Sequence, residues 1–549
     1  MVKIPIREII NSEFIVNADN NYLISNDYLI KQTDSLLFDQ IERIRGVPAN
    51  YISEMILVEA KKNPKTKDDL EYIIRSGFVF NGKRYLRFGK SQSQAKDGIT
   101  AFVCEDIFEE LYFITQLEIK IDECVISKYE SQRCLPFSSC TLIKNYNPKI
   151  VIVGEYEKVI KNQLIKYVVE KEIPFIDKVA GENKTYKSRE IEEGYRDITI
   201  SPFDGCGCHE KEFSEKITEV LGLDYLAIGE QIRKPFMKGY SVFVPFKSIF
   251  ADMGITEITD VYGKVHKVDE IDCIWNTSMF KGHKLFKSEY GNEAWNKYCE
   301  IVEKHKFPLG ISKYSHHIKN INLMARMNFQ YLQCLDLTNP KYVEWFNDKS
   351  YPKYDILDSK NDGKIISIAK YTTDLFEKIV KGDKFYTYKF MGINNTDGYE
   401  AESNYLKAAL TNDIMLKDVA VKQFIHRKLK KSIQEAKIGK IYCSGFYHTV
   451  VGDMIGYLEY VAGREVVGCL KEHEFYCETL PKGKAVSFRS PLVCPSEVNS
   501  VTLVSCDTTK KYLSHFKNQD VVMLNMYDLS LPQQGGIKWR LSSLWETVR

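Results

Sequence analysis

The sequence lacks the features of membrane and secreted proteins. None of its apolar runs approaches the ~20 residues that a helix needs to cross a bilayer. Residues 1–5 lead into polar and charged residues rather than into the apolar core of a signal peptide. The 14 cysteines show no framework of paired spacings, so free thiols are the expected state. We therefore expect a soluble, cytoplasmic protein that has no membrane partner.

The sequence also lacks an excess of charge of either sign. Its formal net charge is +2, which neither requires nor excludes a polyanionic partner, so the local distribution of charge has to decide. With 44% hydrophobic and 27% charged residues, the chain has the composition of a globular protein. Its 549 residues exceed what one compact core can use, so several domains are expected.

Two β-rich blocks separated by a helical stretch make up the second two thirds of the chain. The first block predicts a strand at 197–200, a break at 201–205, a helix at 212–221 that ends at Gly222, and strand-like runs at 240–246 and 272–280. The middle stretch, 290–440, carries helical spacings at 321–335 and 367–380. The chain is again β-rich from 441 onward, where short apolar runs predict strands at 466–470, 474–477, 501–504 and 521–525.

One long amphipathic helix is predicted over 413–437. Its inward positions would be Val421, Phe424, Ile425, Leu429 and Ile433. Its polar face would be basic, through Lys422, Arg427, Lys428, Lys430 and Lys431. Such a face could follow the phosphate backbone of a nucleic acid. A solvated basic face is the equally weighted alternative.

The segment 204–209 combines turn residues with possible metal ligands. Asp204 and the glycines around it are typical of a turn, so we expect a structural role. Cys206, Cys208 and His209 lack the spacing of a structural zinc site. His473 and Cys477 could complete a site in principle, but free cysteines are the favoured interpretation. No metal site is predicted here.

Several short motifs then recur in the order found in one polymerase family. They are Asp-Gly-Cys-Gly at 204–207, Gln-Ile-Arg at 231–233, Met-Lys-Gly at 237–239, Ser-Met-Phe-Lys at 278–281, the segment 326–333, Gly-Phe-Tyr-His at 445–448, Arg-Ser-Pro at 489–491 and Leu-Pro-Gln-Gln-Gly-Gly at 531–536. Together they resemble the two-barrel RNA polymerases, which comprise the RNA-silencing RNA-dependent RNA polymerases and phage-encoded single-chain relatives. The resemblance covers residues 196–536 and leaves the first 190 uncovered.

The resemblance implies an α+β multidomain fold. Residues 1–190 would form a mixed α/β region of unassigned role, 191–290 a first double-psi β-barrel, 291–440 a helical connector, 441–536 the N-terminal part of a second, incomplete double-psi β-barrel, and 537–549 a tail outside the family pattern. In the phage branch, the cytoplasm would be that of an infected or lysogenic bacterial cell.

The chemistry implied by the resemblance is RNA synthesis from nucleoside triphosphates on a nucleic-acid template. Lys238 would reach the triphosphate, and Lys281, preferred over Lys284, would be the second lysine that faces the nucleotide. Arg489 would contact the sugar of the incoming nucleotide, for which its fixed fork of donors is suited. The alternatives are a surface role for the lysines and an arginine packed between strands. Nothing in the sequence decides between a DNA and an RNA template.

The sequence lacks the motif that would hold the catalytic metal. In the family, Mg²⁺ binds an Asp-x-Asp-Gly-Asp loop directly after the Gly-Gly segment, because it prefers hard oxygen ligands. Here residues 537–549 contain no aspartate, and Asp-Gly-Asp occurs nowhere in the chain. We therefore expect no catalytic or metal-binding residue in this chain, no activity without help, and a second, separately encoded polypeptide that carries the loop and the rest of the second barrel. The alternatives are an inactive nucleic-acid-binding remnant and an unrelated interaction protein.

Overall fold

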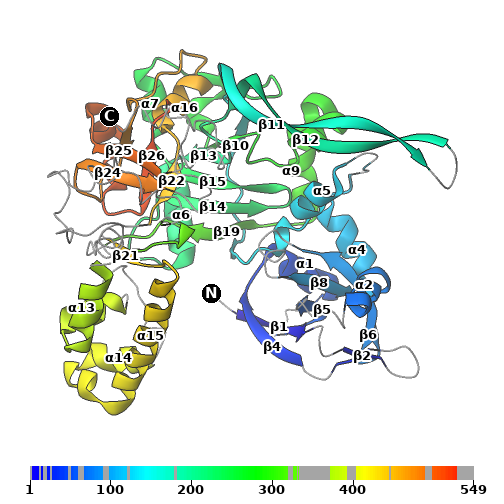
Figure 1. Ribbon diagram of the computed structural model, residues 1–549. Coiled ribbons are helices and arrows are strands. Elements are labelled where there is room, and N and C mark those ends of the chain that lie inside the picture. The colour runs from blue at the N-terminus through cyan, green and yellow to red at the C-terminus, as the bar shows by residue number, and fades with distance from the viewer. Residues whose placement is uncertain are drawn as a thin grey trace.

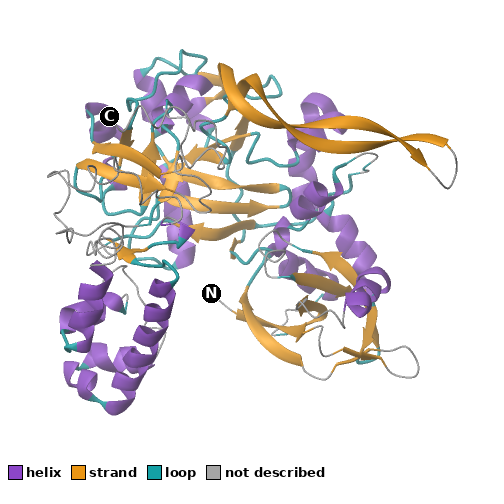
Figure 2. Cartoon of the chain, in the orientation of Figure 1, coloured by secondary structure: helices purple, strands orange, loops and turns teal. Residues whose placement is uncertain are grey.

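The computed structural model describes most of the chain. The described residues are 3–10, 14–16, 22–24, 27–46, 51–59, 67–90, 98–119, 121, 124–177, 182–318, 325–330, 332, 371–391, 404–443, 447–488 and 498–527. They form an N-terminal lobe, a body that contains two sheets, a long two-stranded arm and a helical projection (Figures 1 and 2). Across these residues, none of the helices has the length and apolar character needed to span a membrane.

The N-terminal lobe is a six-stranded sheet of order β4-β1-β5-β8-β7-β6. Its strands are β1 (Lys3–Ile10), β4 (Asp27–Thr33), β5 (Ile52–Glu59), β6 (Phe78–Phe80), β7 (Lys83–Gly89) and β8 (Ile99–Cys104), and its helices are α1 (Leu36–Arg45), α2 (Lys67–Ser76) and α4 (Glu105–Thr115). β5 contributes Met55 and Leu57 to one apolar core and Ile56 and Val58 to another. Since its two faces are both buried, this strand is continuously apolar.

A seven-stranded sheet of order β10-β18-β13-β15-β14-β19-β9 forms one half of the body. Its strands are β9 (Thr141–Ile143), β10 (Ile150–Val153), β13 (Cys206–His209), β14 (Gly229–Lys234), β15 (Met237–Phe243), β18 (Cys273–Asn276) and β19 (Leu309–Tyr314). The sequence confined the first barrel to 191–290, whereas this sheet takes β9 and β10 from before that range and β19 from beyond it. Short strands that lie far apart in the chain carry too little periodicity to be assigned to one sheet.

A five-stranded sheet of order β22-β26-β23-β25-β24 forms the other half. Its strands are β22 (Thr449–Val451), β23 (Glu474–Tyr476), β24 (Gly483–Phe488), β25 (Val498–Val504) and β26 (Val521–Leu524). The strand predicted at 466–470 is wrong, because this run is a loop in which Gly468 has φ +74°. The carboxylates of Glu459 and Asp453 accept hydrogen bonds from backbone N–H groups of this loop. These N–H groups therefore need no partner strand.

The two sheets of the body share one apolar core. It combines Val151 and Ile274 of the seven-stranded sheet with Met454, Tyr457 and Met523 of the other half. The helices α7 (Phe246–Asp252), α16 (Met454–Val461) and α17 (Asp507–Tyr512) accompany this core. A second core covers the opposite side of the seven-stranded sheet, with α6 (Lys211–Leu221), α8 (His283–Tyr290) and α9 (Ala294–Lys304). The predicted helix that ends at Gly222 is confirmed as α6, with Gly222 at φ +66°.

A two-stranded antiparallel arm projects from the body (Figure 1). It consists of β11 (Lys158–Asp177) and β12 (Glu182–Ile200), which pair with each other along almost their whole length. The strand predicted at 197–200 is confirmed as the end of β12. In chain order, the helix α5 (Ile126–Arg133) follows α4 of the N-terminal lobe and precedes β9 of the body.

The helical projection contains residues 371–380, α13 (Lys384–Phe390), α14 (Asn404–Thr411) and α15 (Val419–Lys437). The helix predicted over 413–437 begins six residues late, because Asp413–Lys417 is a 3-10 turn and the Asp418 carboxylate caps Ala420 and Val421. A ladder between β20 (Ala325–Arg326) and β21 (Tyr442–Cys443) joins the projection to neighbouring chain. The helix predicted at 321–335 is therefore wrong at Ala325–Arg326.

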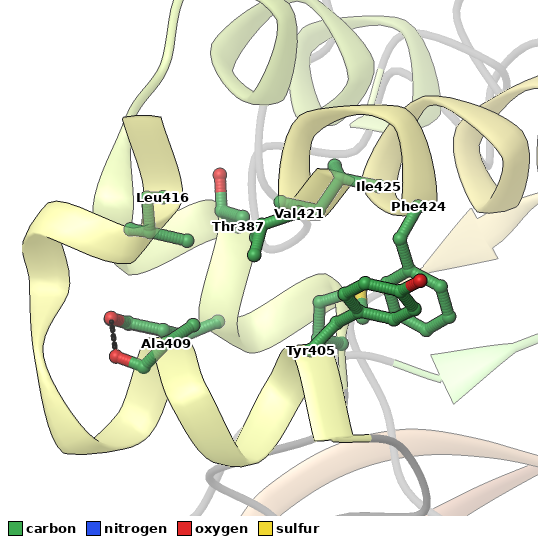
Figure 3. A pocket seen from close by; sticks show the side chains of 9 residues that line it. Thr387, Tyr405, Ala409, Leu416, Val421, Phe424 and Ile425 are labelled. Carbon is green, nitrogen blue, oxygen red and sulfur yellow. Dashed lines mark hydrogen bonds between the residues drawn. The ribbon is translucent and has the colours of Figure 1, made fainter. Parts of the chain in front are cut away.

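The helices of the projection enclose a small apolar pocket (Figure 3). The Tyr405 and Phe424 rings stack there with centroids 5.2 Å apart. Tyr388 Oη donates to the carbonyl oxygen of Ala409 at 2.9 Å. Val421 and Ile425 complete the lining from α15. The pocket is packing space between helices and holds no arrangement of polar groups that would recognise a ligand.

Candidate functional site

The structure brings the two predicted lysines, Lys238 and Lys281, to one carbonyl group. Met237 and Phe280 form an isolated β-bridge. The backbone N–H groups of Lys238 and Lys281 both donate to Met279 O, at 3.0 and 3.1 Å. Both lysine side chains are half-buried, whereas Lys284, the alternative, is exposed in the first turn of α8. Two cationic side chains therefore start from adjacent points at the beginning of β15.

Glycine at position 239 makes this approach possible. A Cβ at Gly239 would lie 2.3 Å from Met279 Cγ and 2.8 Å from Gly205 O. Gly205 itself is tied to both neighbours, since its N–H donates to Ser278 Oγ at 2.6 Å and its carbonyl accepts from Tyr240 N at 2.8 Å. The motifs at 204–207, 237–239 and 278–281 thus meet at one place in the body.

Asp204 lies exposed on the turn between these motifs. Gly205 follows at φ +65°, a conformation that favours glycine. The turn geometry agrees with the structural role expected for Asp204.

Asn276 holds the loop that carries Lys281, and sequence analysis missed it. This fully buried side chain ends β18. Its Nδ2 donates to Phe203 O at 2.7 Å, and its Oδ1 accepts from Ser278 Oγ at 2.8 Å and from Met279 N at 3.1 Å. An asparagine that closes an apolar run was the available signal, because a buried amide has to find partners on a neighbouring loop.

Glu155 holds the base of the arm near this loop. The residue precedes β11, and its carboxylate accepts a hydrogen bond from the hydroxyl of Ser201, which follows β12. Burial raises the pKa of Glu155, and the hydrogen bond from Ser201 opposes that shift. The arm is therefore rooted beside the Lys281 loop. Lys158 of β11 also reaches the second half, where its Nζ lies 5.1 Å from the centre of the Tyr527 ring.

Arg233 adds a third positive charge next to Lys238. The two residues are directly opposite in the β14–β15 ladder, so their side chains leave the same face of the hairpin. Arg233 is buried, and burial lowers the pKa of its guanidinium to about 10. Its Nη1 donates to Ile232 O at 2.7 Å. The sequence had flagged this residue only as part of a motif.

Arg489 lies outside the described residues, as do 444–446, 489–491 and 531–536 of the predicted motifs. In the chain, Arg489 directly follows β24, which ends at Phe488. Its proximity to the two lysines therefore stays a prediction. Of the Gly-Phe-Tyr-His motif, the described residues are Tyr447, whose hydroxyl donates to Arg326 O, and His448, whose Nε2 lies 3.5 Å from Cys477 Sγ.

The basic face predicted for α15 is exposed. Lys422, Arg427, Lys430 and Lys431 are exposed, and half-buried Lys428 places its Nζ 5.3 Å from the centre of the Phe424 ring. Among the residues that the structure describes, no acidic side chain forms an ion pair with any of these five. The only acid of this helix, Glu435, instead pairs with Arg326 and Lys440. The positive charge of this face is not compensated within the described chain.

Of the possible metal ligands weighed in the sequence, Cys206, Cys208, His209 and Cys477 are buried, whereas His473 is exposed. His209 is fully buried in β13, and burial lowers its pKa well below the ordinary value. Its Nδ1 and Nε2 each lie 2.8 Å from a serine hydroxyl, those of Ser241 and Ser214. Within the described ranges, no three histidine, cysteine, aspartate or glutamate side chains come together as a possible metal site. The described cysteines are free thiols.

The chain is similar to two RNA polymerases. It is 23% identical over 499 residues to the DNA-directed RNA polymerase YonO of Bacillus phage SPbeta, a match that covers 87% of this chain and 51% of that protein. Its fold is similar to that of the RNA-dependent RNA polymerase QDE-1 from Thielavia terrestris, with a TM-score of 0.55 and 13% identity over 95% of this chain and 50% of the other. No family model matches the chain.

The chain spans about half the length of each of these two relatives. The resemblance found in the sequence motifs is thus confirmed, as is a mixed α+β multidomain fold of the polymerase kind. The homology contradicts the third alternative, an unrelated interaction protein.

Proposed function

We propose that this chain forms the nucleotide-binding part of an RNA polymerase. The observation that carries the proposal is the shared Met279 carbonyl, which places Lys238 and Lys281 together at the start of β15. Two half-buried ammonium groups would offset the charge of a triphosphate more effectively than exposed ones, because the dielectric constant is lower there. Arg489 would contact the sugar of the same nucleotide.

The repeated strand order supports two double-psi β-barrels. The strands β10, β13, β14, β15 and β18 occur in the spatial order first, fifth, second, fourth, third, and β22 to β26 repeat that order. The parallel and antiparallel pairs also correspond. We assign each set to one barrel, the second requiring further strands, with the helical connector between them and the N-terminal lobe still unassigned.

The reaction we propose is nucleotidyl transfer. The 3′-hydroxyl oxygen of the growing RNA forms a bond to the α-phosphorus of a nucleoside triphosphate, the bond to the β-phosphate oxygen breaks, pyrophosphate leaves, and the hydroxyl proton passes to solvent or a base. Lys238 and Lys281 would bind and orient the triphosphate and stabilise charge on its oxygens.

The described residues do not fit a magnesium ion, because they include no cluster of three possible ligands. The sequence also contains no Asp-x-Asp-Gly-Asp motif. We propose that the Mg²⁺ ligands come from a polypeptide segment that carries this motif, lies outside these 549 residues and completes the second barrel. The chain without that polypeptide would then bind nucleotides but not join them.

The uncompensated basic face of α15 supports contact with the template or product. Four exposed cations that form no ion pair with an acidic side chain of the described residues can displace counterions from a phosphate backbone. This same face favours the second candidate function, an inactive nucleic-acid-binding remnant of a polymerase. The two candidates differ in whether nucleoside triphosphates bind at Lys238 and Lys281.

Equilibrium binding of a fluorescent nucleoside triphosphate to the purified full chain tests the proposal. We expect Lys238→Ala and Lys281→Ala each to weaken binding by about 10- to 100-fold, on the scale of lost charged hydrogen bonds. Lys284→Ala is the matched control, since it removes an exposed lysine three residues away and should change binding little. If all three variants bind the nucleotide as tightly as the unmodified chain, Lys238 and Lys281 do not form a nucleotide site. The inactive nucleic-acid-binding remnant would then be the better interpretation.

A reconstitution experiment tests the separate requirement for acidic ligands. Adding a polypeptide that carries the acidic loop should restore nucleotide incorporation in the presence of Mg²⁺. Incorporation by the purified chain without it would contradict the proposal.

A further inference from the structure

The two-stranded arm has two faces that differ in how far their side chains are covered by contacts within the arm. Opposite residues of an antiparallel pair share a face of the sheet. One face, which we call the 168 face, carries the pairs Leu164–Tyr195, Lys166–Glu193, Val168–Ile191, Glu170–Arg189 and Glu172–Lys187. The other, which we call the 167 face, carries the pairs Ile165–Gly194, Tyr167–Glu192, Val169–Glu190 and Lys171–Ser188.

The 167 face is covered by contacts within the arm. Arg196 stacks on the Tyr167 ring, with 4.4 Å between the guanidinium carbon and the ring centre. Lys171 forms ion pairs with Glu190 and Glu192, both at 2.9 Å. The aliphatic side chains of this face are half-buried. Farther along this face, Tyr186, opposite Ile173, is 51% exposed.

The 168 face instead exposes apolar side chains. Leu164 and Tyr195 are 52% and 62% exposed, and Val168 and Ile191 are 63% and 73% exposed. The four residues form two cross-strand pairs on the same face, with the Lys166–Glu193 pair between them. Large apolar side chains exposed together on one face of a projecting element are typical of a protein-interaction site.

Charge argues against nucleic acid as the occupant of the 168 face. The two strands of the arm carry equal numbers of acidic and basic side chains. On this face, Lys166 pairs with Glu193 at 3.7 Å and Arg189 with Glu170 at 3.3 Å. A phosphate backbone would meet as much negative as positive charge there, so it would release few counterions.

The order of the pairs along the 168 face makes it complementary to itself. The Val168–Ile191 pair has a Lys–Glu pair two residues to one side and a Glu–Arg pair two residues to the other. A two-fold axis through the central pair and across the strands lays β11 antiparallel over the same strand of a second copy. Lys166 then faces the partner subunit's Glu170, and Glu193 faces the partner subunit's Arg189.

The distances suit such packing. Residues two apart in a strand are separated by about 7 Å, and stacked sheets lie about 10 Å apart. Packed sheets cross at about 30°, which displaces groups 7 Å from the axis by only about 3.5 Å. The long side chains of lysine, glutamate and arginine can span that offset.

We infer that the arm is a dimerisation element, in which the 168 face packs against the 168 face of a second copy of this chain around a two-fold axis at Val168 and Ile191. The valine and isoleucine side chains form the apolar centre, and the four ion pairs across the axis fix the register. The isologous interface closes on itself and so limits the assembly to two copies.

Sedimentation of the purified full chain, with charge swaps on the arm, tests this inference. The unmodified chain should form dimers. The K166E/E193K variant keeps its pair within the arm but places like charges opposite each other across the axis, so we expect dimer affinity to fall by about tenfold or more. The variant K166E/E170K/R189E/E193K reverses all four charges, restores opposite signs across the axis, and should recover dimerisation.

A matched control and an apolar variant complete the design. K171E/E190K swaps an ion pair on the 167 face and should leave dimerisation unchanged. V168D/I191D places charge at the centre and should give monomers, with circular dichroism reporting whether the arm keeps its strand content. A monomeric unmodified chain would overturn the inference and leave another protein as the occupant. A dimer with equal affinity in the double and quadruple swaps would also overturn it.

Discussion

The two sheets of the body share a strand order but use corresponding positions differently. The first strand of each set ends at a valine that is followed by a glycine and an acid, at 153–155 in one half and 451–453 in the other. Both glycines lie against the opposite half, since a Cβ at Gly154 would come within 2.8 Å of Tyr460 Oη and one at Gly452 within 2.6 Å of Phe203 Cδ1. The two halves therefore pack around a pseudo-two-fold relation.

The acid that follows has a different role in each half. Asp453 is fully buried, and its carboxylate accepts from the N–H groups of Ile455, Gly456, Cys469 and Leu470, so it closes a loop of its own half. Glu155 instead accepts a hydrogen bond from Ser201, at the base of the arm. The corresponding position thus closes a loop in the second half and holds the base of the arm in the first.

The largest predicted effect follows from this difference. Asp453→Ala leaves four backbone donors without their acceptor in the core, and we expect it to lower the free energy of unfolding by about 4 kcal/mol or more. Glu155→Ala is the matched variant at the corresponding position and should cost about 1 kcal/mol, because fewer donors lose their acceptor. Scanning calorimetry of both variants compares the costs, and equal losses would contradict the division of roles.

The junction between the halves should respond to acid. His515 packs its ring on Phe243 with centroids 4.1 Å apart, and its Nε2 donates to Phe243 O at 2.9 Å. Burial lowers the pKa of His515 to about 4. Because the folded pKa lies below the ordinary value of about 6.5, the unfolded chain binds more protons between these values. The stabilising contribution is complete above pH 6.5 and is lost as the pH falls towards 4.

The expected loss from His515 is on the order of 3 kcal/mol between pH 6.5 and 4. His515→Gln keeps a side-chain donor for Phe243 O but removes the titration, so its stability should change less with pH in this window. Urea unfolding midpoints measured across the window give the slopes. Identical slopes for the two proteins would show that this junction does not titrate.

Sequence analysis found the motifs of the first half but not the residues that hold them in place. The glycines at 205 and 239 and the lysine at 281 carry a recognisable pattern, and the structure brings their segments together. Asn276 and Glu155 act through contacts with residues 73 and 46 positions away, and no local spacing encodes such pairs. The limits of the first sheet were missed for the same reason, since β9 and β10 join it only through long-range pairing.

The smallest predicted effect concerns two buried asparagines at corresponding positions of the two halves. Asn276 is the last residue of β18, and Asn525 directly follows β26. Both are fully buried, and both donate from Nδ2 to a carbonyl, that of Phe203 before β13 at 2.7 Å and that of Glu474 in β23 at 3.0 Å. Replacing either by alanine should lower the free energy of unfolding by about 2–3 kcal/mol. Scanning calorimetry of Asn276→Ala and Asn525→Ala checks whether the two costs agree.

Nucleotide affinity should separate these two variants even though their stabilities match. Only Asn276 holds Ser278 and Met279, whose carbonyl positions Lys238 and Lys281. Asn276→Ala should therefore weaken binding of a fluorescent nucleoside triphosphate severalfold, while Asn525→Ala serves as the control of equal structural cost. If both variants lose nucleotide affinity to the same extent, general destabilisation explains the loss, and the result does not assign the nucleotide site to the first half. If only Asn276→Ala weakens nucleotide binding, the loop that carries Lys281 binds the nucleotide, and this role belongs to the first half although both halves share the strand order.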